Sequence, residues 1–458
     1  MTKTMELSTR KQNVILKSKS LRNALGEIID EMSLVEMDTY SFSRSTALET
    51  DIEGDGVITG FCTIADYPFY VVAQNFEVLS GGLTVGQTTK ILKCLEKAEK
   101  SNTPILYMLN SRGILYGEGI PALEGLSKII KKCNDLKSEV MQMCVLDGEL
   151  YGSLAVLPAM CDFTIMTKKG TLGSSSPLVI SAKSNKNLPA SEILSGEIHS
   201  SKTGACEIVV EDLKGAKDSI AKILSIIPET SEIIEDEKVD LNSTVDFNGD
   251  AEKIFDKGDF IEIYKGYSSS VKFYIGRIGG ISTAVLSFVN KEEGVELCPK
   301  KIRGIRRFYD LVADLNMPLI NLVNAKGIES SIGVEQSDTL KGIGDLVLSL
   351  SLIDAGKIAL VYGKAVGLGY SLFASKSMDY DFVLATENSE IALFDKTQGA
   401  MIEYGKEMTA ENKAELENKY FEEKSNPYVA SELGGIDNVI LDYEVRQYLI
   451  ATLQTLIR

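Results

Sequence analysis

The sequence contains no tryptophan and a single histidine, His199, and its seven cysteines form no CxxC pair. One imidazole excludes every catalytic triad or metal scheme that needs more than one. The cysteines are odd in number and several lie in apolar segments, so we expect buried free thiols in a reducing cytoplasm and no metal site in this chain.

Long apolar runs and basic charge are also scarce. No run approaches the roughly 20 apolar residues of a membrane span, and the start, MTKTMELSTRKQ, lacks the apolar core of a signal peptide. A cytoplasmic protein is therefore expected. The net charge is −17, which disfavours nucleic acid as a partner because an acidic chain repels phosphate backbones. An anionic cofactor needs only a local cluster of Lys and Arg and is not excluded.

The length of 458 residues exceeds what one hydrophobic core usually supports, so two domains are expected. A segment that is acidic and poor in large apolar residues begins at Pro228. We predict an acidic connector over residues 228–258 between an N-terminal half, residues 1–227, and a C-terminal half, residues 259–458.

Each half alternates apolar strand segments with amphipathic helices, which predicts an α/β fold. One passage occurs twice: ILYMLNSRGI (105–114) and LINLVNAKGI (319–328) each lead an apolar strand into Asn, two residues and Gly. A second glycine follows 39 residues after Gly113, at Gly152, and 40 residues after Gly327, at Gly367. The matching order and spacing predict an internal duplication.

The glycine turns are the candidate chemical feature of this repeat. In each half two buried strands are expected to end side by side in turns whose backbone amides are free. Such amides can hold the oxygen of a thioester enolate, and glycine permits the tight turn and the close approach. The candidate donors are Gly152–Ser153 and Leu368–Gly369. For each turn taken singly, a purely geometric role of the glycine stays open, but the duplicated pair favours function.

Other residues give weaker signals. The stretch Val366–Gly369 lacks the GxGxxG fingerprint of a dinucleotide site. His199 lies in a polar stretch, Gly170–Gly204, that we interpret as an exposed excursion, and a structural role is expected for it. The loop tyrosines Tyr116 and Tyr151 could line a pocket or merely fill space. A basic group could bind phosphates or a partner's carboxylates, or could be a solvated surface; it consists of Lys300, Lys301, Arg303, Arg306 and Arg307.

Four stretches carry a family resemblance: AQNFEVLSGGL (73–83), YGEG (116–119), SEIALFDKTQGA (389–400) and NPYVASELGGIDNVI (426–440). They resemble the carboxyltransferase subunits of biotin-dependent acyl-CoA carboxylases of the propionyl-CoA carboxylase β subunit type. They equally resemble the carboxyltransferase subunits of methylmalonyl-CoA or glutaconyl-CoA decarboxylases. The resemblance runs from about Gly56 to the C-terminus.

The resemblance implies two tandem crotonase-like domains, each a spiral of ββα units. It also implies a homo-oligomer, a dimer or a trimer of dimers, whose active site joins the N-terminal half of one subunit to the C-terminal half of another. Matched by motif, acyl-CoA is expected at Gly81, Gly82, Leu83, Gly113, Gly117 and Gly119. The oxyanion turns are expected at Gly152, Ser153, Leu368 and Gly369, the biotin side at Lys326, Gly327, Gly333 and Gly367, and the substrate pocket at Tyr151 and Ser371.

The chain departs from the family at three places. Asn110–Leu115 stands for D-S-G-G-A-R, Tyr151–Leu154 for A-G-G-A, and Val366–Ser371 for Y-G-G-A-Y-D. Backbone amides survive side-chain changes, so activity is still expected. Ser371 in place of Asp leaves the identity of the acyl group open.

The function implied by the resemblance is transfer of a carboxyl group between N-carboxybiotin and the α-carbon of a short acyl-CoA, acetyl- or propionyl-CoA-like, through an enolate. The sequence contains neither an A-M-K-M-like biotin-attachment motif nor an ATP-grasp module, so biotin carboxyl carrier protein and biotin carboxylase are expected as separate chains. Two alternatives stay open. One is a subunit of a sodium-pumping methylmalonyl-CoA or glutaconyl-CoA decarboxylase with membrane partners, and the other is a non-catalytic assembly subunit.

Overall fold

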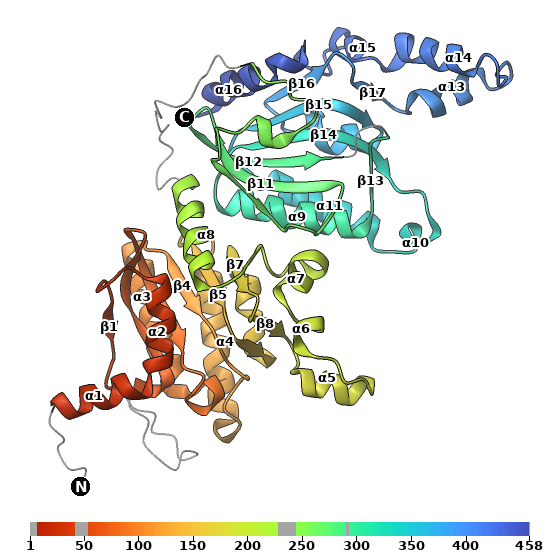
Figure 1. The fold of residues 1–458 in the computed structure, drawn as a ribbon. Helices are drawn as coiled ribbons and strands as arrows, with labels where there is room; N and C mark the ends of the chain where they lie inside the picture. Colours follow the sequence, from red (N-terminus) through yellow and green to blue (C-terminus); the bar gives the residue numbers. More distant parts are fainter. Residues whose placement is uncertain (1–6, 42–53, 228–243, 290–292, 458) are drawn as a thin grey trace. The chain divides into compact units, whose positions relative to one another are not determined.

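The computed structural model describes residues 7–41, 54–227, 244–289 and 293–457, and the chain divides into two compact units, residues 1–224 and 225–458 (Figure 1). Each unit has its own sheet, helices and hydrophobic core. None of the helices in the described ranges combines the length and apolarity needed to cross a bilayer.

The sheet of the first unit has the strand order β1-β2-β3-β4-β5-β7-β9. β2 pairs antiparallel with β1 and β3, and the neighbours from β3 to β9 are parallel, while β6 and β8 form a separate parallel pair. The strands are β1 Val35–Met37, β2 Val57–Ile64, β3 Tyr67–Gln74, β4 Ile105–Met108, β5 Gln142–Leu146, β6 Glu149–Tyr151, β7 Phe163–Thr167, β8 Thr171–Gly173 and β9 Ile208–Val210. The helices are α1 Leu7–Lys17, α2 Lys19–Ile28, α3 Val85–Ser101, α4 Ile120–Asp135, α5 Pro177–Ser184, α6 Ala190–Ile193, α7 Gly196–Ile198 and α8 Leu213–Ile226.

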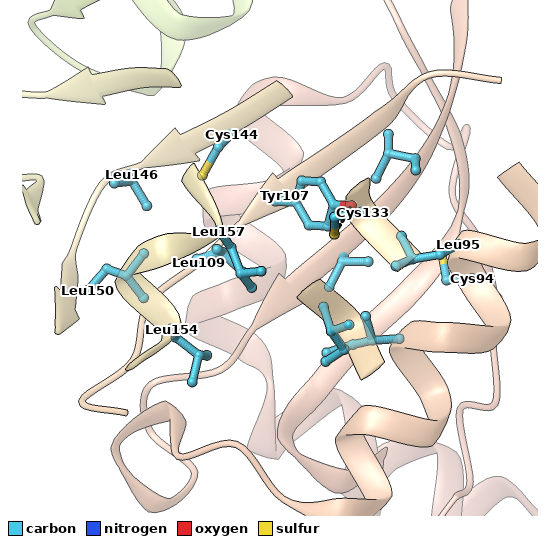
Figure 2. Packing of buried hydrophobic residues seen from close by; sticks show 14 of the residues in the cluster. Cys94, Leu95, Tyr107, Leu109, Cys133, Cys144, Leu146, Leu150, Leu154 and Leu157 are labelled. Atoms are coloured by element: carbon cyan, nitrogen blue, oxygen red, sulfur yellow. Dashed lines mark hydrogen bonds between the residues drawn. The ribbon is translucent and has the colours of Figure 1, made fainter. Parts of the chain in front are cut away.

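The core of the first unit forms where α3 and α4 lay their apolar stripes on the sheet. Leu95 of α3 and Cys133 of α4 pack with Tyr107 and Leu109, and Figure 2 shows this packing from close by. The Tyr107 hydroxyl lies 3.3 Å from the Cys133 Sγ and donates a 3.0 Å hydrogen bond to Gln142 Oε1, so this buried polar group is satisfied. The expectation of free thiols is confirmed: every cysteine is unpaired, Cys161 and Cys298 are half-buried, and the rest are buried.

The second unit repeats this plan with the strand order β10-β11-β12-β14-β15-β16-β18, and β13 and β17 pair with β14 and β15. Its strands are β10 Phe260–Ile263, β11 Val271–Ile278, β12 Ile281–Phe288, β13 Val295–Leu297, β14 Leu319–Ile328, β15 Lys357–Val366, β16 Phe382–Thr386, β17 Glu390–Ala392 and β18 Asn438–Ile440. Its helices are α9 Pro299–Asp314, α10 Ile332–Glu335, α11 Thr339–Ser351, α12 Leu368–Phe373, α13 Lys396–Tyr404, α14 Lys413–Tyr420, α15 Pro427–Glu432 and α16 Val445–Leu456.

The predicted connector, residues 228–258, is only partly described. Residues 228–243 lie outside the described ranges. Phe247, Ile254 and Phe255 belong to the core of the second unit, where they pack with residues of β14, β15 and α16. This end of the segment is therefore part of a domain, because its apolar residues complete a core.

Strand register confirms the internal duplication. Ser111 pairs with Leu150 in the first unit, as Ala325 pairs with Ala365 in the second. Leu150 pairs in turn with Leu172, as Ala365 pairs with Ile391. The residues next to Gly113 and Gly152 are thus held in the same register as the residues next to Gly327 and Gly367.

Candidate functional site

The first glycine turn brings Gly113 and Gly152 together. Backbone hydrogen bonds from Ser111 N to Glu149 O, 2.6 Å, and from Tyr151 N to Ser111 O, 2.9 Å, align the two segments. Gly113 has φ +116° and Gly152 has φ +77°, and a Cβ atom on Gly152 would lie 3.6 Å from the Gly113 Cα. Glycine suits both positions because other residues rarely adopt positive φ.

A short 3₁₀ helix, Gly152–Val156, begins at this turn. The first amides of a helix have no partner inside it, and within the described part of the chain the N-cap residue, Tyr151, makes no side-chain capping bond to this helix start. The amides of Gly152 and Ser153 therefore fit the predicted role of oxyanion donors. Apolar contacts anchor the turn to the domain, because Leu150, Leu154 and Leu157 pack into the hydrophobic core (Figure 2).

The two loops predicted to hold acyl-CoA meet in the structure. Leu83 N donates to Gly113 O at 2.9 Å, and Leu115 N donates to Leu83 O at 3.0 Å. The Glu118 carboxylate accepts from Val85 N at 2.6 Å and so ties the second loop to the start of α3. Gly81 and Gly82 stand directly before Leu83, Gly117 lies in the one-turn helix Tyr116–Glu118, and Gly119 precedes α4 with φ +54°.

A cleft of about 540 Å³ opens beside the first turn. Gly152 and Ser153 line it together with Ala155, Val156, Leu172, Gly173, Ser174, His199, Thr203 and Ala205. The structure therefore brings His199, which the sequence analysis placed in an exposed excursion, to the edge of the candidate site. That expectation was wrong for His199, which is 9% exposed, because the segment returns to the domain before residue 199.

His199 uses one ring nitrogen to reach the segment at Leu172 and the other to contact Thr203 within its own helical turn. Its Nε2 lies 2.6 Å from the Leu172 carbonyl and its Nδ1 lies 3.0 Å from the Thr203 hydroxyl. A carbonyl only accepts, so Nε2 carries a proton, and in the neutral ring Nδ1 accepts from Thr203. Burial lowers the pKa of His199, and the Leu172 carbonyl opposes that shift only in part. The ring is therefore a neutral structural link at neutral pH.

The Tyr151 side chain is buried and is not among the described residues that line the cleft. It is 4% exposed, and its hydroxyl lies 2.7 Å from the Thr171 hydroxyl. Burial raises the pKa of Tyr151, so the phenol is neutral at physiological pH. Tyr116, by contrast, is 97% exposed.

The second turn repeats the geometry of the first. Gly327 has φ +100°, and a Cβ atom there would lie 3.7 Å from Val366 O, as a Cβ atom on Gly113 would lie 3.6 Å from Tyr151 O. Gly367 has φ +55° and precedes α12, whose start has no side-chain cap. By the strand register given above, Gly152 matches Gly367, so the predicted donors Leu368 and Gly369, the first residues of α12, correspond to Ser153 and Leu154. Gly369 is also required by packing, because a Cβ there would lie 2.2 Å from Ala325 O.

Four charged side chains form a cluster beside the second turn. Lys326 Nζ lies 3.1 Å from Asp395 Oδ2, and Lys364 Nζ lies 3.6 Å from Glu390 Oε2 and 3.9 Å from Asp395 Oδ2. Burial raises the pKa of Asp395, but the Gln398 amide and the two ammonium groups outweigh it and leave this pKa below its usual value. Burial lowers the pKa of Lys326, and the bond to Asp395 more than compensates. Both groups stay charged at neutral pH.

The remaining predicted residues of the second half are more peripheral. Ser371 is exposed, and its hydroxyl donates to Gly367 O at 3.3 Å. Gly333 lies in α10 with nothing within 4 Å of a Cβ atom. On α9, Arg303 pairs with Asp338 and Arg306 with Asp345, which favours a solvated surface network for these two arginines.

Three residues of this region were not singled out from the sequence: Gln74, Gln87 and Glu118. Gln74 and Gln87 contact the carbonyls of Gly81 and Gly82, and Glu118 contacts the amide of Val85. Gln74 lies within the AQNFEVLSGGL stretch, but nothing in its local pattern distinguishes a glutamine that holds a distant carbonyl from one that is solvated. Only the fold reveals these contacts.

Comparison with known proteins gives a consistent result. The family described as "Carboxyl transferase domain" matches residues 18–458. The chain is 26% identical over 463 residues to the methylmalonyl-CoA carboxyltransferase 12S subunit of Propionibacterium freudenreichii subsp. shermanii, covering 95% of this chain and 88% of that protein. It is 25% identical to methylmalonyl-CoA decarboxylase subunit alpha of Propionigenium modestum, covering 94% and 88%.

A propionyl-CoA carboxylase beta chain, from Saccharopolyspora erythraea, is 24% identical, covering 96% of this chain and 87% of the relative. Among solved structures, a transcarboxylase 12S crystal structure with methylmalonyl-coenzyme A and methylmalonic acid bound superposes with a TM-score of 0.87. The two chains are 25% identical, and the match covers 98% of this chain and 94% of the other, whose assembly is described as a hexamer.

Proposed function

We propose that this chain, which belongs to the carboxyl transferase domain family, transfers a carboxyl group between biotin on a separate carrier protein and the α-carbon of a short acyl-CoA. The chain is a biotin-dependent carboxyltransferase with a crotonase-like fold. Propionyl-CoA and acetyl-CoA are the proposed substrates. The observation that supports this most directly is the pair of glycine turns with matching register and uncapped helix starts.

In the first half, the thioester of acyl-CoA would enter beside Gly152 and Ser153. Removal of the α-proton or of the α-carboxyl group places negative charge on the thioester oxygen, and the two amides would donate to it. A preorganised donor of this kind is worth about 3 kcal/mol of transition-state stabilisation. The loops at Gly81–Leu83 and Gly113–Gly119 would hold the rest of the coenzyme A.

In the second half, the amides of Leu368 and Gly369 suit an oxygen acceptor such as the ureido oxygen of biotin, because both are donors at the start of a helix. Biotin, when bound, supplies the nitrogen that gives up the carboxyl group and takes the α-proton in exchange, or the reverse. Lys326, Gly327, Gly333 and Gly367 would line its approach. No side chain of the two turns needs to act as an acid or a base, which agrees with the neutral, internally bonded His199.

The proposed partners follow from this division of labour. Biotin carboxyl carrier protein and biotin carboxylase would be separate chains, and the active site would join the first half of one subunit to the second half of another in a dimer or a trimer of dimers. The similarity to methylmalonyl-CoA decarboxylase subunits supports one alternative, in which the same chemistry runs toward decarboxylation with membrane subunits as partners.

Free biotin and a panel of acyl-CoA esters test the proposal. Calorimetry with acetyl-, propionyl-, butyryl- and glutaryl-CoA should give binding for at least one ester. The purified protein should then decarboxylate the matching malonyl-CoA-type ester in the presence of free biotin as acceptor. Absence of binding to every ester at millimolar concentration would contradict the proposal, and binding without turnover in the presence of a biotin carrier would indicate an assembly subunit.

A further inference from the structure

Two buried glutamines hold consecutive carbonyl groups of the Gly81–Leu83 loop. Gln74, the last residue of β3, donates from Nε2 to Gly81 O at 3.3 Å, and Gln87, in the first turn of α3, donates from Nε2 to Gly82 O at 3.1 Å. Gln74 is 1% exposed and Gln87 is fully buried. The two side chains reach the loop from different elements, so they fix two successive peptide planes.

Each of these glutamines leaves its other polar atom unsatisfied. Neither Oε1 atom has a hydrogen-bond partner among the described residues. Turning either amide over would set Oε1 against a carbonyl oxygen, so the glycine carbonyls dictate the observed orientation. A buried acceptor without a partner is destabilising. A methionine of similar size would remove the unpaired Oε1 but would also leave the glycine carbonyl without its donor, so the glutamine is needed for its bond to the loop.

The second unit anchors the corresponding carbonyl with a different residue. Leu83 forms a β-bridge with Ile114, and Leu297 pairs in the same way with Ile328, so Leu83 and Leu297 are equivalent positions. Counting from them, Gly82 corresponds to Glu296 and Gln87 to Lys301. Lys301 Nζ donates to Glu296 O at 2.7 Å. Gln74, which pairs with Val57, corresponds to Phe288, which pairs with Val271 and has no donor. One anchor is common to both halves, and the second occurs only on the side proposed to bind acyl-CoA.

The anchored loop is connected to the first glycine turn. Leu83, directly after the two held carbonyls, donates from its own N to Gly113 O. Gly113 in turn packs against Gly152. A shift of the Gly81–Leu83 loop would therefore move both the proposed coenzyme A contact and the backbone next to the Gly152 amide.

We propose that Gln74 and Gln87 are positioning residues for acyl-CoA, which hold the carbonyls of Gly81 and Gly82 inward and so keep the loop shaped for the coenzyme. This inference rests on the proposed function and names the side chains that prepare its first subsite. The glutamines touch neither substrate nor reacting atoms. Their effect is expected in the binding of acyl-CoA and not in the binding of biotin.

Gln142 provides a matched control. It is a buried glutamine of the same unit, 1% exposed, and it uses both ends of its amide inside the core: Nε2 donates to Cys133 O at 2.9 Å, and Oε1 accepts from Tyr107. Its replacement removes hydrogen bonds and lowers stability without touching the glycine loop. A general loss of stability can thus be separated from a loss of loop position.

The experiment compares Gln74→Met, Gln87→Met and Gln142→Met in the full chain, with KM for the acyl-CoA ester, KM for free biotin, kcat and melting temperature measured for each. Gln74→Met and Gln87→Met should raise KM and the calorimetric Kd for acyl-CoA at least fivefold while KM for free biotin stays within twofold. Gln142→Met should lower the melting temperature and leave every KM within twofold. If a Met variant does not fold, the shorter Gln74→Asn or Gln87→Asn replaces it, since it cannot span the same distance to the carbonyl.

The inference would be overturned if all three variants bound acyl-CoA as tightly as the wild type does. It would also be overturned if KM for biotin rose as much as KM for acyl-CoA. Either result, obtained with a wild-type protein that binds acyl-CoA and transfers the carboxyl group, leaves the proposed function standing. A wild-type protein that binds no acyl-CoA overturns the proposed function itself and this inference with it.

Discussion

The two glycine turns have the same backbone arrangement but differ in the charged side chains around them. Asn110 Oδ1 accepts from Glu149 N at 3.1 Å, and Asn324 Oδ1 accepts from Lys364 N at 2.9 Å, so the same asparagine positions the same strand in both halves. Beside the first turn, Arg112 and Glu149 form an exposed ion pair of 2.9 Å. Beside the second, Lys326 and Lys364 share the buried carboxylates Asp395 and Glu390.

Under the proposed function, the shared backbone would serve the chemistry and the differing side chains would serve the two ligands. The amide donors come from the backbone, and the backbone is what the duplication has kept. The side chains around the turns have diverged in sign and burial, in keeping with two different ligands. Changes to the glycines should therefore affect both turns alike, whereas changes to the surrounding side chains should affect the two halves unequally.

The largest effect is expected from Gly152→Val and Gly367→Val. Valine is strained at the positive φ of either turn and would obstruct a substrate oxygen, so each variant should lose turnover at least 100-fold while the protein stays folded and oligomeric. Transfer assays together with size-exclusion chromatography check this. Gly152→Ala is the milder control, because its Cβ would lie 3.6 Å from the Gly113 Cα, which is ordinary van der Waals contact.

A retained rate in one of the two valine variants would show that its turn serves geometry alone. The equivalence of the two turns would then be restricted to the fold. The comparison would shift from two functional turns to one functional turn and one structural copy.

The charged cluster of the second half should matter more for stability than the ion pair of the first. Asp395→Asn leaves two partly buried lysines short of a counter-charge and should destabilise by about 1–3 kcal/mol. Glu149→Gln should cost less than about 0.5 kcal/mol, because its pair with Arg112 is exposed. Urea unfolding of both variants measures the difference, and equal costs would contradict the distinction between a buried cluster and a solvated pair.

The pH dependence of this cluster has a definite sign. Because the pKa of Asp395 is lowered in the folded protein, its contribution to stability is fully present above the ordinary carboxyl pKa near 4 and is lost as pH falls through the lower folded value. The unfolding free energies of wild type and Asp395→Asn should therefore differ at pH 7, begin to converge below about pH 4 and meet only below the folded pKa of Asp395. A gap that widens on acidification would contradict this.

The shared asparagines should show a smaller asymmetry. Asn324 is 1% exposed and Asn110 is half-buried, so Asn324→Ala should destabilise by about 1–2 kcal/mol and Asn110→Ala by less. Thermal unfolding of the two variants tests the order. A larger loss at Asn110 would mean that the first turn depends more heavily on this bond than its burial indicates.

The smallest effect on turnover is expected for His199→Ala. The ring is neutral and bonded through both nitrogens, so its loss should cost some stability but leave the rate within about tenfold of the wild type, whereas general acid–base catalysis typically supplies 10²–10⁴. A thousandfold loss in a folded protein would make this imidazole the acid or base of the reaction.

The sequence was sufficient for the duplication, the α/β fold and the two turns, because these leave periodic or repeated signals. The signals are apolar strands, an Asn three residues before the loop glycine, and a fixed spacing between the glycines. The sequence was insufficient for Gln74, Gln87 and the cluster of Lys326, Lys364 and Asp395. These contacts join residues far apart in the chain, and their partners are backbone carbonyls or single charges that no local pattern encodes. The burial of His199 was missed because a polar composition at Gly170–Gly204 hid the return of the chain to the domain.

The end of the connector shows the same limit. Acidic residues after Pro228 indicated a solvated segment, but the apolar residues Phe247, Ile254 and Phe255 that follow contribute to the core of the second unit. Composition averaged over residues 228–258 does not separate the acidic residues from the apolar core residues that follow them. A boundary drawn from charge alone therefore extends too far into the domain.

The most direct test of the central claim, that each half supplies one turn of a shared site, is to co-refold Gly152→Val with Gly367→Val. If the site joins the first half of one subunit to the second half of another, a mixed pair of subunits contains one site with both lesions and one with neither. Random pairing makes roughly half of the pairs mixed, so about a quarter of all sites should regain activity. Recovered carboxyl transfer from two inactive parents is the predicted result. Mixed pairs that are shown to form and remain inactive would contradict the account.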